Sequence, residues 1–453
     1  MLKRTINLAL LASVAMVSTA FAEVASSGPS LPTLSINGNT VMNAYYAHNS
    51  KNTDESRNVH LSNDVSDLYF TIKGRMSNGI EYGYKMGLQS FAAGSPVFQQ
   101  NFIEFNGKFG TVQIGNVVGV EDSMIADASS IGGGMGTFDG GYHNVVNMPA
   151  FVMRGNDNIG DTGYATKIVY YTPTYYNFQF GVTYTPNTAH RGDAGMDKAT
   201  LNGNTNAPGN RNFLPNKKLY PYDLDSFAFG LSYKKELNNW GINLNGAYIT
   251  GDSYYPAITD DVGTTPAKRT KAHRTNAYQL GAVVGYRRQN GHLVQVAGGW
   301  LDNGKSRLQK DNTSIYLNNP DLGRYVNVGT NVPDAITFGN LYQGNSGKAW
   351  NVGTAYVMGV YKFAATFQQT ERKTDATNRA RTSVASLTAD VVPVGGLKFY
   401  VEADYVHARS NDTARATAAS LAGLGSDAAR RTGQNQIQGN DAFVLALGTK
   451  VSF

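Results

Sequence analysis

Segments in which apolar residues alternate with small or polar ones recur along the whole chain. The clearest spans residues 79–89, where Ile, Tyr, Tyr, Met and Leu alternate with Glu, Gly, Lys, Gly and Gln. A period of two gives a strand one apolar and one polar face, and is typical of half-buried β-structure. The pattern predicts sixteen strands, at residues 34–47, 67–74, 79–89, 101–106, 111–116, 166–171, 177–184, 226–233, 240–248, 277–287, 292–300, 348–357, 360–367, 383–391, 397–405 and 441–453.

The connections between these strands alternate strictly between short and long. The short ones carry Gly, Pro or Asn turn chemistry, at residues 75–78, 107–110, 172–176, 236–239, 289–291, 359 and 393–396. The long polar ones include residues 186–224, 251–274, 302–347 and 410–440. A soluble sandwich or propeller has little reason for this asymmetry. It favours an all-β, 16-stranded antiparallel transmembrane β-barrel with short periplasmic turns and long extracellular loops.

Composition fits a barrel better than other membrane or soluble classes. Mean hydropathy is only −0.32, yet 50 glycines accompany 27 Tyr, 20 Phe and 3 Trp, with 16% charged residues. Alternate residues of a barrel face lipid and lumen, so its average hydropathy stays low. The absence of cysteine excludes disulfides and thiolate sites. The formal net charge of +6 is spread along the chain, without the basic arm expected of a nucleic-acid binder.

The first 22 residues read as a secretory signal peptide. Lys3 and Arg4 precede a mostly apolar run at residues 6–17, and Ala20-Phe-Ala22 gives a small-x-small cleavage site. The run is too short to serve as a membrane-spanning anchor. We therefore expect cleavage after residue 22 and a single barrel domain over residues 23–453.

The last strand ends on an aromatic residue and carries one apolar face. That face comprises Phe443, Leu445, Leu447, Val451 and Phe453. An open sheet edge is not tolerated in lipid, so we expect this strand to pair with the first one, near residue 34.

Several motifs, in order, give the chain a family resemblance. Residues 170–186 (YYTPTYYNFQFGVTYTP) resemble the strand–turn–strand signature of Gram-negative general porins, and residues 107–116 (GKFGTVQIGN) resemble the hairpin before their constriction loop. The overall character is similar to alphaproteobacterial porins. The resemblance implies a homotrimer in the outer membrane, in contact with outer-membrane lipids and lipopolysaccharide. It also implies that the C-terminal Phe strand is read by the outer-membrane assembly machinery.

Residues 118–163 stand where that family carries an inward-folded third loop. Glu121, Asp122, Asp127 and Asp139 are the candidate carboxylates of a pore constriction, although each is equally suited to capping a turn. By analogy with the family the facing wall is basic. Strand parity selects Lys73, Lys85 and Lys167 for it.

Two further features, an oxygen-rich stretch and a set of tyrosines, predict a function less directly. Asp157, Asn158 and Asp161 form an oxygen-rich stretch that suits a structural calcium ion, with a spacing unlike an EF-hand; we expect no other cofactor. Tyr residues at 170, 184, 233, 248, 286 and 405 share parity with Leu, Val and Ile, which favours an interfacial girdle over a sugar-stacking ladder.

Taken with the resemblance, these patterns imply a water-filled channel for passive diffusion of small hydrophilic solutes and ions. A sugar- or anion-selective channel of the same fold is the main alternative. A barrel enzyme is disfavoured because the seven histidines are scattered and fit no hydrolase or metal motif. An adhesin or phage-receptor surface on the long loops is compatible with a channel.

Overall fold

A computed structural model describes residues 30–51, 58–89, 97–135, 142, 145–149, 159, 162–188, 222–255, 270–307, 347–373, 379–410 and 439–453. Its strands are β1 (Ser30–Asn49), β2 (Val59–Arg75), β3 (Glu81–Gln89), β4 (Val97–Gly107), β5 (Gly110–Asn116), β6 (Thr166–Tyr171), β7 (Phe178–Asn187), β8 (Tyr222–Leu237), β9 (Trp240–Tyr255), β10 (Thr270–Lys271), β11 (Thr275–Arg287), β12 (Leu293–Asp302), β13 (Lys348–Met358), β14 (Tyr361–Lys373), β15 (Arg379–Val394), β16 (Leu397–Ser410) and β17 (Gly439–Ser452). Two short helices, α1 (Val120–Ser123) and η2 (Ala128–Ile131), lie between β5 and β6.

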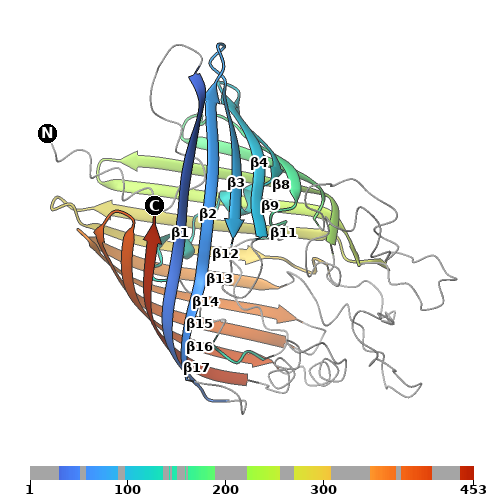
Figure 1. Ribbon diagram of the computed structural model, residues 1–453. Coiled ribbons are helices and arrows are strands. Elements are labelled where there is room, and N and C mark those ends of the chain that lie inside the picture. The colour runs from blue at the N-terminus through green and yellow to red at the C-terminus, as the bar shows by residue number, and fades with distance from the viewer. Residues whose placement is uncertain are drawn as a thin grey trace.

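The strands close into one antiparallel barrel (Figure 1). Each spanning strand pairs with its neighbours in sequence, and β1 pairs with β17 from Asn39↔Ser452 to Asn49↔Ala442. The two-residue β10 only extends the edge of β9, so sixteen strands form the wall. All sixteen predicted strands are confirmed.

Most strands run further towards the long loops than the sequence pattern predicted. On β9 the prediction ended at Tyr248, whereas the strand continues to Tyr255. The outward residues beyond that point are polar, as at Thr250 and Asp252. The alternation in hydropathy ends there while the hydrogen-bonded ladder continues.

The short connections and both ends of the barrel chain share one rim. Gly79, Gly291 and Gly359 take positive φ values of 83°, 84° and 60° in these turns, where a side chain is strained. Ser30 pairs with Arg75, and Ser452 N donates to Gly396 O at 2.7 Å. We call this the short-turn rim, and the opposite one the long-loop rim.

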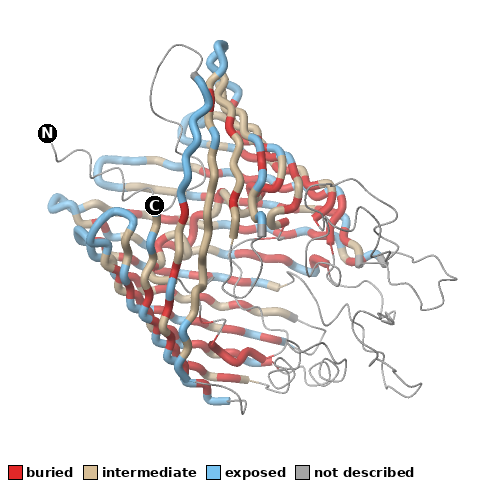
Figure 2. The backbone as a smooth tube through the Cα atoms, in the orientation of Figure 1, coloured by how far each residue is buried: buried red, intermediate tan, exposed pale blue. Residues whose placement is uncertain are grey.

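Burial is inverted relative to a soluble protein. Along β17 the buried residues are small or polar, whereas Phe443, Leu447 and Phe453 are 43%, 55% and 69% exposed on the outer face. The same alternation of buried and exposed residues runs around the wall (Figure 2). Outward apolar side chains suit a hydrocarbon surround. No helix among the described residues is long and apolar enough to cross a membrane.

Outward aromatic residues pair across strands at two levels. Trp240 and Tyr286, directly opposite each other near the short-turn rim, have ring centroids 4.8 Å apart. Towards the long-loop rim, Tyr278 and Trp300 lie 5.1 Å apart. Tyr248, which pairs with Tyr278, is 40% exposed on this face. Rings at both levels are the expected form of interfacial girdles.

We predict that Phe453→Ala impairs barrel assembly before it affects conductance. Phe453 and Gly38 exchange backbone hydrogen bonds of 3.0 Å across the closing seam, and the Phe453 ring packs against Gly38. Losing that packing weakens the contact between β1 and the C-terminal end of the chain. The folded fraction after refolding, read as heat-modifiable mobility on gels, should fall severalfold. Phe363→Ala, which removes an outward phenyl ring from β14, away from the two seam strands, is the control; an equal loss in both variants contradicts the prediction.

Candidate functional site

The described part of the chain between β5 and β6 lies inside the barrel. We call its described residues, 117–135, 142, 145–149, 159 and 162–165, the inner segment. Val120 N donates to Thr183 Oγ1 of β7 at 2.9 Å, and Ala128 N donates to Asn351 Oδ1 of β13 at 3.1 Å. Both acceptors belong to the buried, lumen-facing set of their strands. The inner segment therefore runs along the inside of the wall.

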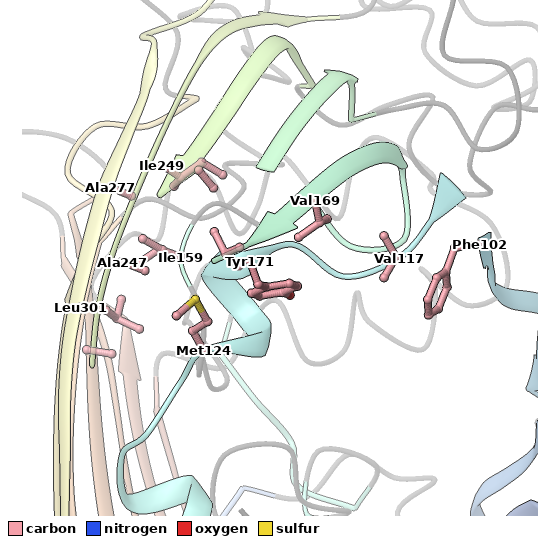
Figure 3. Packing of buried hydrophobic residues seen from close by; sticks show 13 residues of the cluster. Phe102, Val117, Met124, Ile159, Val169, Tyr171, Ala247, Ile249, Ala277 and Leu301 are labelled. Carbon is pink, nitrogen blue, oxygen red and sulfur yellow. The ribbon is translucent and has the colours of Figure 1, made fainter. Parts of the chain in front are cut away.

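Apolar packing fixes the inner segment along much of this path. Met124 and Ile159 lie in one cluster with Tyr171, Ala247 and Ile249 of the wall (Figure 3). A second cluster joins Ile131 and its neighbours to β11–β14. A third joins Tyr142, Val145, Val146 and Met148 to β1 and β15–β17. The wall side chains in these clusters are mostly alanine and valine.

Wall glycines mark the course of the first half of the inner segment. They come from five strands, and at each an added Cβ would collide with the inner segment or with side chains around it. The glycines are Gly181, Gly230, Gly281, Gly299 and Gly353. At Gly181 the nearest atom is Val120 Cγ1 at 2.7 Å, and at Gly299 it is Asp127 Cβ at 2.6 Å. The missing side chains form a track in which residues 120–128 lie.

Charged side chains of β14–β16 hold the next part of the inner segment. Lys362 Nζ donates to Gly132 O at 2.5 Å, and Lys398 Nζ to Gly134 O at 2.9 Å. Asp390 Oδ1 accepts from Gly134 N at 2.8 Å. Lys398 and Asp390 also form an ion pair of 3.5 Å. The backbone polar groups of this stretch are thus satisfied by lumenal charges.

The structure places three of the four predicted constriction carboxylates. Glu121 is 2% exposed and accepts a hydrogen bond from the Thr162 hydroxyl. Asp127 is 6% exposed, caps η2 through Ser129 N at 2.8 Å and accepts from Asn351 Nδ2 at 2.8 Å. Asp122 is half-buried, and Asp139 lies outside the described residues. Their role at a constriction stays a prediction.

The predicted basic residues separate into two environments. Lys73 of β2 and Lys85 of β3 face the lumen together, and both interact electrostatically with Glu104. Lys85 Nζ also lies 4.7 Å from the centre of the Tyr69 ring. Lys167, by contrast, is 2% exposed and donates to the Gly163 carbonyl of the inner segment.

The lumenal charges that contact the inner segment were not predicted from the sequence. Lys362 stands between the outward Tyr361 and Phe363, and Lys398 between Leu397 and the outward Phe399. Strand parity, applied to every strand, would have found both. Their contact with a segment more than two hundred residues away carries no local signal.

The calcium candidates Asp157, Asn158 and Asp161 lie outside the described residues. Within the described part of the chain, no cluster of three or more His, Asp or Glu side chains has the arrangement of a metal site.

A closed barrel with an apolar exterior, a polar interior and an inner segment defines a class of outer-membrane channel. The family model for Gram-negative porins matches residues 9–426, and the chain belongs to that family. It is an outer-membrane porin that forms a water-filled channel.

Solved structures are similar to the chain at low sequence identity. An anion-selective porin from Comamonas acidovorans is 14% identical with a TM-score of 0.51, covering 93% of this chain and 100% of that one. A mutant Rhodopseudomonas blastica porin is 12% identical, with a TM-score of 0.48 and the same coverage. OmpT of Vibrio cholerae is 11% identical, with a TM-score of 0.49, over 93% of this chain and 99% of that one. No curated protein matches the chain in sequence.

We predict that Gly281→Val displaces the inner segment. An added Cβ collides with the Ala126 carbonyl oxygen, and such overpacking costs about 1–3 kcal/mol. Because the chain lacks cysteine, Gly132→Cys gives a unique reporter, with its nearest atoms 3.7 Å from the new Cβ. Its labelling by a water-soluble maleimide should quicken about tenfold or more.

Gly241→Val is the matched control, since a Cβ at Gly241 meets no atom within 4 Å. Unchanged labelling in Gly281→Val, with the barrel folded, would show that the glycine track does not position the segment.

Proposed function

We propose that this porin is a general diffusion channel in which residues 118–163 narrow the pore. The observation that supports this is the seating of the inner segment against lumen-facing side chains of β7, β13 and β14–β16. A segment held inside the barrel reduces the open cross-section. Small hydrophilic solutes and ions then pass by size, and the wet lumen requires no tight binding.

Charge on the wall adds a modest selectivity. Lys73 and Lys85 reach the lumen from β2 and β3, whereas the hydrogen bonds described above hold the inner segment to β7, β13 and β14–β16. With Asp122 and the other acidic candidates, they form the two sides of a transverse field in this proposal. Such a field orients dipolar solutes and weakens as salt shortens the Debye length.

The same proposal covers assembly and orientation. The porin forms a homotrimer, with the short-turn rim in the periplasm and the long-loop rim outside. Residues 1–22 are removed on export, and the β17 face that includes Phe443, Leu445 and Phe453 is read by the outer-membrane assembly machinery. The outward exposure of these residues supports that reading. Sedimentation of the purified protein tests the trimer.

Planar-bilayer recording tests the channel itself. Purified protein should give stable conductance steps that grow in proportion to salt concentration. A substrate-selective channel would instead show saturation by one sugar or anion. If no water-filled steps appear from folded protein, the proposal fails.

We predict that replacing Lys73 and Lys85 by Gln shifts the reversal potential towards cation selectivity. In water, a lysine about 8 Å from a permeating ion changes the electrostatic energy of that ion by about 0.5 kcal/mol. Removing two lysines should therefore raise the cation-to-anion permeability ratio at least about threefold at low salt. Near 1 M salt, where the Debye length is about 3 Å, most of the shift should disappear. Lys235→Gln, on the outer face of β8, removes the same kind of charge outside the lumen. A shift as large in this control would contradict a lumenal field.

A further inference from the structure

Four oxygen-bearing side chains form a buried square on the lumenal face of β15 and β16. Glu402 and Asp404 are two residues apart on β16. In the register, Thr388 of β15 lies opposite the first of them and Ser386 opposite the second. Such neighbours on one face are about 7 Å apart along a strand and about 5 Å apart across strands. All four are between 2% and 6% exposed. We call this set the oxygen square, and its size allows one small ion to contact every member.

The inner segment covers the oxygen square. Met135 N donates to Glu402 Oε2 at 2.6 Å. A Cβ added at Gly133 would lie 2.2 Å from Thr388 Oγ1, so the backbone passes close to that hydroxyl. On the neighbouring strand, the β17 residues opposite the two carboxylates belong to the apolar cluster that includes Tyr142. The square is therefore enclosed between the wall and the inner segment.

Two oxygens of the square have no hydrogen-bond partner within the described part of the chain. They are Asp404 Oδ1 and Thr388 Oγ1. The Ser386 side chain lies beside Asp404, and the described charge that acts on Asp404 is the like charge of Glu402. A buried carboxylate is costly unless an opposite charge accompanies it. A neutral ligand would supply hydrogen bonds without that charge, whereas a cation supplies it.

The two lysines on the short-turn side of the square are engaged with other groups. Lys398 Nζ forms an ion pair with Asp390 at 3.5 Å and donates to the Gly134 carbonyl at 2.9 Å. Lys362 Nζ donates to a carbonyl of the same inner segment at 2.5 Å. No lysine or arginine in the described ranges forms an ion pair with Asp404. The negative charge of the square is thus not offset by these side chains.

The ligand atoms of the square favour a hard cation. Two carboxylates and two hydroxyls present oxygen alone, without the imidazole or thiolate groups that transition metals prefer. Calcium takes about six to eight oxygen ligands and accepts an irregular arrangement of them. Magnesium demands a near-ideal octahedron and retains most of its water, which suits an enclosed square less.

We propose that the oxygen square binds a calcium ion that ties the inner segment to the wall. The ion offsets the charges of Glu402 and Asp404. It takes the hydroxyl oxygens of Ser386 and Thr388 as further ligands. Glu402 is thereby held where it accepts the hydrogen bond from Met135 N. The proposal concerns the seating of the inner segment and does not depend on whether that segment narrows the pore.

Equilibrium dialysis of the refolded full-length porin against radiolabelled calcium tests the site. After divalent ions are removed with a chelator, the wild-type protein should bind calcium saturably. Asp404→Asn keeps the shape of the side chain and removes one ligand charge, so it should weaken the affinity about tenfold or more. Thr388→Val, which removes only the hydroxyl, should also weaken it. Asp67→Asn removes the same charge from the lumenal face of β2 and should leave the affinity unchanged.

Three outcomes of this experiment would overturn the proposal. The first is the absence of saturable binding by folded wild-type porin. The second is binding that is lost in Asp157→Asn with Asp161→Asn but kept in Asp404→Asn, since the ion would then belong to the oxygen-rich stretch. The third is an infrared band of a protonated carboxylic acid that persists in saturating calcium and disappears in Asp404→Asn, because a proton would then replace the cation.

Labelling of the Gly132→Cys reporter gives a second readout, from the inner segment itself. Chelation of calcium should quicken maleimide labelling severalfold when the wall is otherwise wild type. It should have no effect when Asp404→Asn is also present. A chelator effect of equal size in both proteins would show that calcium acts elsewhere and would contradict the proposal. Planar-bilayer conductance tests the channel proposal separately, because calcium binding does not require an open pore.

Discussion

The structure depends on the hydrogen bonds that join β1 to β17. In hydrocarbon an unpaired peptide group costs several kcal/mol, because no water is present to replace its partner. The antiparallel register from Asn39↔Ser452 to Asn49↔Ala442 removes the two open edges at once. The even number of spanning strands, the shared rim of both ends of the barrel and the contact of Phe453 with Gly38 all follow from that antiparallel closure.

Closure creates a lumen, and the inner segment of the same chain occupies part of it. The inner segment needs room along the wall and partners for its backbone. Glycine and alanine on β7–β13 provide the room, and Lys362, Lys398 and Asp390 provide partners further on. The two devices alternate along the segment: packing holds residues 120–131, charged side chains hold Gly132 and Gly134, and packing resumes from Tyr142 to Met148. A porin of this construction positions its inner segment by the composition of its wall.

Strand positions could be predicted from the sequence because the outward and inward environments differ at every second residue. The positions of the short turns could also be predicted, because these turns require a positive φ at Gly79 and Gly359 and glycine adopts it without strain. The path of the inner segment could not be predicted, because it depends on pairs such as Ala128 and Asn351 that are distant in sequence. For the same reason, the sequence left open whether Glu121 and Asp127 line a constriction or cap a turn, whereas the structure buries both and makes Asp127 the cap of η2.

The two levels of outward aromatic pairs bear on the surrounding bilayer. Trp240 and Tyr248 are eight residues apart on β9 and pair with Tyr286 and Tyr278, a separation of about 26 Å along the strand. With a strand tilt of about 40°, the two levels are about 20 Å apart along the barrel axis. A hydrogen-bonded barrel cannot shorten or lengthen to match a different membrane. Where the hydrocarbon layer is thicker, the lipids must thin around the porin, so the cost of mismatch falls on the membrane.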